Sequence, residues 1–256
     1  MAIPGAVTDP ARIRGEDISY PSGGTSIRAY LARPSEGGRH PGILVIHEAF
    51  GLNDHIRDIA NRFAQRGYIA LAPDLYTRHG APDPGVPNSI MATMFGLPDA
   101  EAVQDMEAGA ARIRSEAGSN GRVGVMGFCS GGRHTLLLAF SSPVVDAAVS
   151  CWGGFIRRAT PDEVTTASRP TPVIDLAPDL HCPLLVAIGR EDQNPSPEDA
   201  AALKRTLEGV HHPVTVKVYE DAGHAFFADY RPTYREPAAF ELWDDATRFL
   251  DTQLGS

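Results

Sequence analysis

Short apolar runs alternate with segments of helical periodicity along most of this 256-residue chain. Near the beginning, apolar residues at alternate positions of 18–20 and 27–31, joined by a turn at 22–25, predict an antiparallel hairpin. Later apolar runs predict buried strands at 41–47, 68–72, 122–126, 147–151, 183–189 and 214–219. Amphipathic segments predict helices at 54–67, from 99 onwards, and at 131–140, 198–207 and 237–254. Together they favour an α/β fold: a mostly parallel central sheet with an N-terminal antiparallel hairpin and helices on both faces.

The chain shows no linker, internal repeat or low-complexity block, so we predict a single domain over residues 1–256. Residues 1–14 are expected to form an N-terminal extension of that domain. Two proline-rich stretches without periodicity, 79–98 and 155–180, are predicted to be long loops. Since ligands bind beyond the carboxyl ends of parallel strands, we expect both loops near the functional site.

Composition excludes several classes of function. Lys and Arg total 23 against 32 Asp and Glu, giving a net charge of −9 without any basic run, which argues against a nucleic-acid partner. The apolar runs are far shorter than the roughly 20 residues that span a bilayer, and residues 1–20 lack a secretory signal. The three cysteines form no CxxC or other metal-ligand spacing. We therefore expect a cytoplasmic protein without metal or cofactor that acts on a small molecule, with neither nucleic acid nor membrane as partner.

A candidate nucleophile lies where the strand ending at residue 126 turns into a helix. The sequence Gly-Phe-Cys-Ser-Gly-Gly of residues 127–132 has the glycine spacing of a nucleophile elbow, with Cys129 in place of the usual serine. Glycines are needed there because the backbone passes too close for Cβ atoms. The helix start favours a thiolate, and the N–H of Ser130 would face an oxyanion. The alternative is a small buried cysteine in a packing turn.

A nucleophile of this kind needs an acid and a histidine, which follow it in that chain order in such folds. Asp192 lies just after the strand at 183–189, and His224 lies just after the strand at 214–219. We predict that these two residues complete a triad. Glu191 is the competing acid.

The loop after the first parallel strand, residues 47–53, provides the second group of candidates. In this position the loop normally gives a backbone N–H to the oxyanion hole, and Ala49 is the candidate. Glu48 would oppose an anion beside the cysteine unless it accepted the thiol proton, which makes it a candidate catalytic residue. The alternative is that Glu48 complements the dipole of the following helix. His55 has no placed partner and is predicted to be exposed.

Five motifs in this order and spacing resemble the dienelactone hydrolase (carboxymethylenebutenolidase) family: His47–Asn53, Ala72–Tyr76, Gly127–Gly132, Gly189 with Asp192, and Ala222–Phe226. The resemblance runs from about residue 17 to the C-terminus. It implies an α/β-hydrolase fold, a triad of Cys129, His224 and Asp192, and hydrolysis of a lactone in aromatic catabolism through an acyl-enzyme. It also implies that Glu48 holds the thiol proton until substrate displaces it.

The family binds its substrate's carboxylate with two arginines. Arg78 matches the first, but the position of the second, four residues after the histidine, is Ala228 here, and Arg231 is the nearby replacement. We therefore expect a hydrolase that opens a small, anionic lactone or ester by thiolate attack. A general carboxylesterase or thioesterase on the same fold, or a ligand-binding module without catalysis, remains as an alternative.

Overall fold

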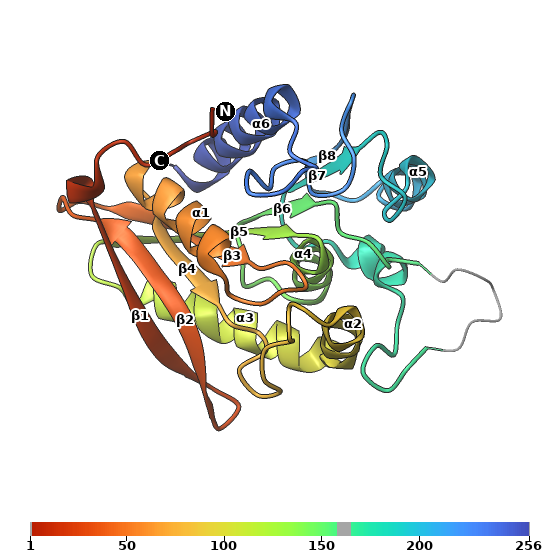
Figure 1. Cartoon of the computed structure of the whole chain (residues 1–256), viewed down its shortest axis with the longest axis horizontal. Helices are drawn as coiled ribbons and strands as arrows, with labels where there is room; N and C mark the ends of the chain where they lie inside the picture. Colours follow the sequence, from red (N-terminus) through yellow and green to blue (C-terminus); the bar gives the residue numbers. More distant parts are fainter. Residues whose placement is uncertain (1, 158–164, 256) are drawn as a thin grey trace.

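An eight-stranded mixed sheet forms the centre of the computed structural model, which describes residues 2–157 and 165–255 (Figure 1). Its strands are β1 (Ile13–Ser22), β2 (Thr25–Pro34), β3 (His40–Ile46), β4 (Ile69–Pro73), β5 (Ser119–Phe128), β6 (Ala147–Cys151), β7 (Leu184–Gly189) and β8 (Val214–Tyr219). They lie in the order β1-β2-β4-β3-β5-β6-β7-β8. The pairs β1–β2 and β2–β4 are antiparallel, and every other neighbouring pair is parallel. The carboxyl ends of the parallel strands therefore meet at one edge, where the candidate residues follow β3, β5, β7 and β8.

Helices cover both faces of this sheet. They are α1 (Asp54–Gln65), α2 (Pro87–Gly96), α3 (Asp99–Arg114), α4 (Ser130–Ser141), α5 (Pro197–Thr206) and α6 (Glu236–Leu254), with 3₁₀ turns η1 (Pro10–Arg12) and η2 (Val173–Asp179). One face packs against α1 and α6, and the other packs against α3, α4 and α5 (Figure 1). The predicted architecture, a mostly parallel sheet with an N-terminal hairpin and helices on both faces, is confirmed.

Local sequence explains how α1 forms beside the site. The Asn53 side chain accepts a hydrogen bond from the Ile56 N–H at 3.1 Å and so caps the first turn. Ile56, Ile59 and Phe63 form a fully buried stripe against the sheet. The helix stops before Gly67, whose φ of +101° suits only glycine. The loop at residues 47–53 is thus fixed between a buried strand and a capped helix.

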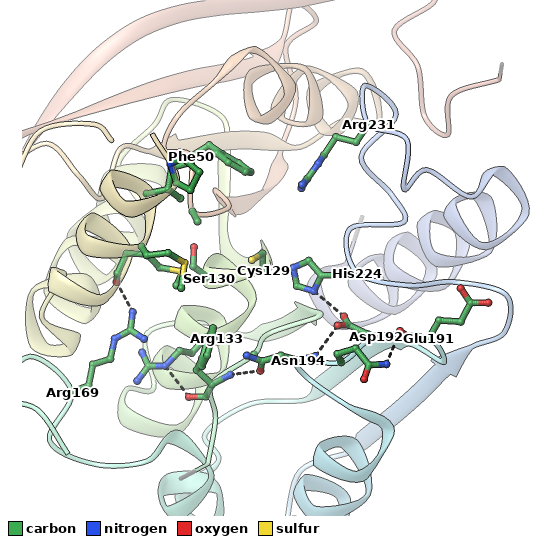
Figure 2. Close-up of a pocket in the computed structure, with 18 residues that line it drawn as sticks. Phe50, Cys129, Ser130, Arg133, Arg169, Glu191, Asp192, Asn194, His224 and Arg231 are labelled. Atoms are coloured by element: carbon green, nitrogen blue, oxygen red, sulfur yellow. Dashed lines mark hydrogen bonds and ion pairs between the residues drawn. The ribbon is translucent and has the colours of Figure 1, made fainter. Parts of the chain in front are cut away.

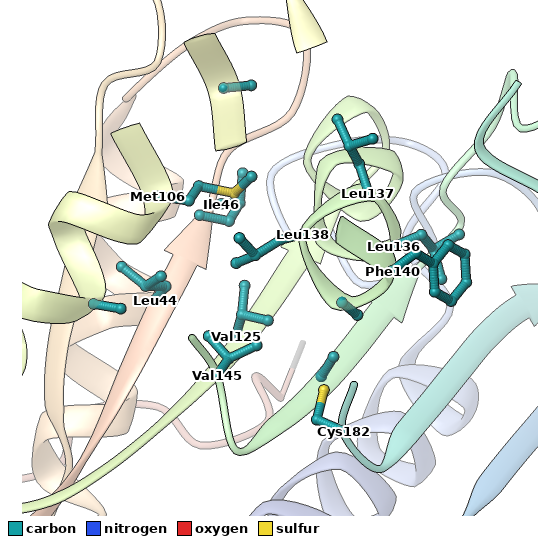
Figure 3. Close-up of a cluster of buried hydrophobic side chains, with 14 of the residues drawn as sticks. Leu44, Ile46, Met106, Val125, Leu136, Leu137, Leu138, Phe140, Val145 and Cys182 are labelled. Carbon is teal, nitrogen blue, oxygen red and sulfur yellow. The ribbon is translucent and has the colours of Figure 1, made fainter. Parts of the chain in front are cut away.

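The core between the sheet and α3 and α4 supports the strand ends from below. Leu44 and Val125 from the strands meet Met106 from α3 and Leu138 from α4 in one buried cluster (Figure 3). Burying a side chain of this size contributes about 1.5–3 kcal/mol relative to leaving it exposed. This packing holds the strands, and so the residues that follow their carboxyl ends, in fixed positions.

The two predicted loops were wrong in part. Residues 79–98 contain the helix α2, and the described part of 155–180 contains the turn η2, while residues 158–164 lie outside the described residues. The sequence did not indicate α2 because this helix places little apolar surface in the core: Met94 is its only buried residue. The predicted N-terminal extension, 1–14, contains η1 and the start of β1. The single domain over 1–256 stays a prediction.

Candidate active site

Cys129 lies in the tight turn between β5 and α4. Its backbone angles, φ 55° and ψ −116°, are unfavourable for a residue with a Cβ and cost about 1–3 kcal/mol. A Cβ on Gly131 would lie 2.4 Å from the Ile46 carbonyl oxygen, and one on Gly127 would lie 2.2 Å from the Gly131 carbonyl oxygen. Both glycines are therefore required, and the strand–turn–helix geometry expected here is present.

His224 and Asp192 lie beside Cys129 at the ends of neighbouring strands. The Nδ1 atom of His224 is 2.9 Å from Oδ2 of Asp192, and Oδ1 of Asp192 accepts a hydrogen bond from the Asn194 N–H at 2.9 Å. Asp192 is only 2% exposed, whereas Glu191 is exposed and its carboxylate points away from His224 (Figure 2). Asp192 is thus the carboxylate that orients His224.

Cys129 faces the other side of the His224 ring (Figure 2). Burial alone would lower the pKa of His224, but hydrogen bonds to Asp192 and Cys129, together with their charges, raise it to about 10. The imidazole therefore holds a proton at neutral pH. In this state His224 can donate a proton to a leaving oxygen.

Glu48 is buried next to this group. Its Oε2 accepts a hydrogen bond from the Tyr230 hydroxyl at 3.2 Å, and its Oε1 lies 3.7 Å from Nη1 of Arg231. Burial raises the pKa of Glu48, while the charges of Arg231 and His224 oppose that shift. Because Asn53 already caps α1 and Glu48 contacts Tyr230 and Arg231, the geometry disfavours the helix-dipole alternative.

The loop that carries Tyr230 and Arg231 is fixed by Asp229. This carboxylate accepts a hydrogen bond from Arg62 and lies 3.5 Å from Nδ1 of His55. The exposure expected for His55 was wrong: its side chain is 8% exposed and its ring packs 4.9 Å from the Tyr230 ring. Burial lowers the pKa of His55 to about 4, although Asp229 opposes the shift. His55 is therefore neutral at pH 7 and serves as a packing partner of the loop.

A cavity of about 530 Å³ opens over Cys129. Seven of the residues considered from sequence line it: Ala49, Cys129, Ser130, Asp192, His224, Arg231 and the competing acid Glu191. Ser130 is the first residue of α4, so its N–H has no acceptor within the helix and can face a bound oxyanion. Glu48 does not line the cavity itself, but it contacts Arg231, which does, and Tyr230.

Arg78 lies away from this cavity. Its Nη2 donates hydrogen bonds to Oδ1 of Asp105 at 2.6 Å and to the Ser22 carbonyl at 3.0 Å. Asp105 is 1% exposed, so the pair is a buried link between the β1–β2 hairpin and α3. Arg78 is not among the residues that line the cavity, and this position gives no support to a substrate-binding role.

Two arginines that sequence reasoning missed line the cavity instead, Arg133 and Arg169. Arg133 lies on α4, where its guanidinium makes two hydrogen bonds to the Asp99 carboxylate, at 2.6 and 2.9 Å. Arg169 belongs to the stretch 155–180. The prediction that this stretch lies near the site was the only signal in the sequence that pointed to Arg169. Neither arginine belongs to a motif.

The two other cysteines differ from Cys129 in burial. Cys151 and Cys182 are buried, and burial raises the pKa of both thiols, that of Cys182 to about 12. Of the three, only Cys129 is partly exposed and next to a histidine. Within residues 2–157 and 165–255, no three His, Cys, Asp or Glu side chains form a group that could hold a metal ion. None of the helices in this part of the chain could span a membrane.

The fold is that of an α/β-hydrolase, and comparison with known proteins agrees. Residues 27–254 match the model of the Dienelactone hydrolase family. A Salmonella typhimurium LT2 protein named "Putative carboxymethylenebutenolidase" is 36% identical over 228 residues, covering 88% of this chain and 82% of the relative. The chain belongs to the dienelactone hydrolase family and is an enzyme of the hydrolase class.

Two further proteins are similar to this chain. A Bradyrhizobium protein named "Probable 2-oxo-3-(5-oxofuran-2-ylidene)propanoate lactonase" is 28% identical, over 93% of this chain and 94% of the relative. A crystal structure titled "Putative Dienelactone Hydrolase" from Klebsiella pneumoniae superposes with a TM-score of 0.84 at 34% identity, covering 93% of this chain and 98% of the other. The similarity therefore extends over nearly the whole chain.

Proposed function

We propose that this enzyme opens a small lactone or ester that bears a carboxylate, using Cys129 as nucleophile and passing through an acyl-enzyme. The observation that carries the proposal is the alignment of Cys129, His224 and Asp192 at the ends of β5, β8 and β7, with Asp192 hydrogen bonded to His224 at 2.9 Å. The lactone in the name of the Bradyrhizobium relative also carries a carboxylate, which supports the anionic substrate class.

The reaction follows from this geometry. The Cys129 thiolate attacks the carbonyl carbon, and the carbonyl electron pair moves to oxygen, where the N–H groups of Ser130 and Ala49 stabilise it. The tetrahedral intermediate collapses, the C–O bond of the ester breaks, and the His224 imidazolium gives its proton to the leaving oxygen. Neutral His224 then takes a proton from water, which attacks the thioester and releases the acid and the thiolate. Asp192 holds the imidazole in place through both steps.

Glu48 has a separate part in this proposal. A thiolate at rest invites oxidation, whereas a thiol is protected but unreactive. The raised pKa of Glu48 makes it a better proton acceptor than an exposed carboxylate, because burial disfavours its charged form. We assign it the task of taking up the proton of the Cys129 thiol when substrate arrives.

The test is a steady-state screen of cis- and trans-dienelactones beside neutral esters, with intact-protein mass spectrometry to detect a thioester on Cys129. A matched pair of variants isolates the triad. Asp192→Asn should lower kcat/KM on the order of 10²–10⁴-fold, because His224 loses its orienting partner. Glu191→Gln, one residue away, should change it by less than about twofold.

The outcomes separate the alternatives. Turnover of neutral esters alone would show a general carboxylesterase or thioesterase. Ligand-induced stabilisation without turnover would show a binding module. A larger loss in Glu191→Gln than in Asp192→Asn would refute the triad.

A further inference from the structure

The charges around the cavity are not equivalent. Three arginines line it, and two of them already face a carboxylate. Arg133 makes its paired hydrogen bonds to Asp99, and Arg231 lies 3.7 Å from the carboxylate of Glu48. Arg169 is the third. Within the described part of the chain, no carboxylate forms an ion pair with it.

The surroundings of Arg169 leave donor capacity unused. Its Nη2 donates to the Met94 carbonyl at the end of α2, and its guanidinium lies over the Phe95 ring, 4.6 Å from the centroid. Its Nε is buried without a hydrogen-bond partner among the described residues. Burial and the charge of Arg133 lower the pKa of Arg169 to about 10, so the side chain stays cationic at neutral pH. The charge of Asp99 opposes this shift, but Asp99 already holds Arg133 through two hydrogen bonds. A bound anion would add the directly contacting counterion that the described residues do not give Arg169.

The position of Arg169 also fits a bound substrate. Arg169 and Arg231 flank the Cys129–His224 pair from opposite sides (Figure 2). Beside Arg169, the cavity wall is apolar, because Ile90, Met91 and Met94 of α2 face it. This corner of the cavity therefore offers one cation next to a hydrocarbon surface.

We propose that Arg169 binds the carboxylate of the substrate, and that the hydrocarbon part next to this carboxylate packs on α2. Arg231, by contrast, stays with Glu48. This inference rests on the proposed function and names the group that selects its anionic substrate. The guanidinium fork suits a carboxylate because two N–H groups can donate in parallel.

The test compares two esters that differ in one charge, 4-nitrophenyl hemiadipate and its methyl ester. Arg169→Gln should lower kcat/KM for hemiadipate roughly ten- to a hundredfold, the usual range for a lost charge-assisted hydrogen bond. The methyl ester should change by less than about threefold. Arg169→Lys should recover part of the loss. Arg157→Gln, an exposed arginine outside the cavity on the same segment, should leave both esters unchanged.

Other outcomes would overturn the inference. An equal loss for both esters in Arg169→Gln would mean that Arg169 only holds α2 in place. A loss selective for hemiadipate in Arg231→Gln, and absent in Arg169→Gln, would place the carboxylate at Arg231.

A binding measurement separates this inference from the proposed reaction. In the Cys129→Ala background, adipate should raise the unfolding temperature, and Arg169→Gln should abolish that shift. If the wild type hydrolyses neither ester but the shift behaves this way, the reaction fails and the anion site stands. If adipate gives the same shift with and without Arg169, the anion site fails.

Discussion

The two sides of the cavity are built differently. Cys129, Asp192 and His224 lie within five residues of the ends of β5, β7 and β8. Hydrogen bonds such as that from the Asn194 N–H to Asp192 hold them. The opposite wall consists of α2 and the described residues of the 155–180 stretch. It exposes large apolar side chains, among them Met91 and Phe155, each more than 40% exposed.

Side-chain contacts link α2 to the 155–180 stretch, and a backbone hydrogen bond from the Ile174 N–H to the Ile156 carbonyl links two parts of that stretch. Phe95 of α2 packs edge-on against Phe155 at 5.0 Å, and Arg169 donates to the Met94 carbonyl. The sheet thus holds the proposed catalytic residues in place, whereas the side chains of the opposite wall can adjust to the substrate. Substitutions on the sheet side should alter the rate for every substrate, whereas substitutions in the wall should alter the choice between substrates.

The largest effect is expected for Cys129→Ala on the sheet side. Removing a triad nucleophile typically costs on the order of 10⁴-fold or more in turnover, for neutral and anionic esters alike. The same variant should lower the pKa of His224 from about 10, because the hydrogen bond and charge of Cys129 help to raise it. Steady-state kinetics and NMR titration of the imidazole measure the two effects. Activity near that of the wild type would exclude Cys129 as nucleophile.

The raised pKa of His224 also predicts how folding stability depends on pH. The folded state binds the His224 proton more tightly than the unfolded state does. This protonation therefore stabilises the folded state, and its full contribution to the free energy of unfolding is present below about pH 6.5. It is lost as the pH rises through about 10. Chemical denaturation from pH 6 to pH 10 should show a decline in the wild type that is smaller in Cys129→Ala. Parallel curves would contradict the coupling between Cys129 and His224.

Arg78→Ala should act on stability rather than on selectivity. Breaking a buried ion pair leaves Asp105 without its partner, at a cost of about 3–5 kcal/mol in the free energy of unfolding. Urea titration measures this loss. Because Arg78 lies outside the cavity, the ratio of kcat/KM for an anionic and a neutral ester should not change. A selective fall for the anionic ester would return Arg78 to the substrate site.

Glu48→Gln should change both the chemistry and the reactivity of the thiol. If Glu48 accepts the thiol proton, turnover should fall roughly tenfold or more, which is modest for the loss of an acid–base group. The rate of Cys129 alkylation should also depend differently on pH. Superimposable alkylation profiles in wild type and variant would leave Glu48 a purely structural partner of Tyr230 and Arg231.

The smallest effect on stability is expected for Met91→Ala in the opposite wall. The side chain is largely exposed, so the free energy of unfolding should change by less than about 0.5 kcal/mol. The KM of esters with a hydrocarbon group should rise, while that of acetate esters should stay the same. A uniform change in kcat instead would mean that α2 also positions the triad.

The difference between the strand ends and the opposite wall of the cavity also explains what could be predicted from the sequence. The order of strands and helices and the triad candidates followed from periodicity and glycine spacing, which are local signals. Arg78 was proposed from its motif, whereas its partner in the structure, Asp105, lies 27 residues away on another element, a pairing that no motif indicates. Arg169 and α2 were missed because Arg169 belongs to no motif and the apolar side chains of α2 face the cavity rather than the core. Their positions depend on contacts with each other, which no local reading reveals.

The first residues of the chain brace the loop after His224 from a great distance in sequence. The Tyr234 hydroxyl donates to the carbonyl of Ala2, 232 positions earlier, at 2.6 Å, and Arg62 spans from the Pro4 carbonyl to Asp229. Cleavage of the chain between residues 5 and 12 would therefore remove a support of the loop whose Tyr230 and Arg231 contact Glu48. We expect such cleavage to lower activity while the central sheet stays folded, although the cut lies far from the nucleophile in sequence.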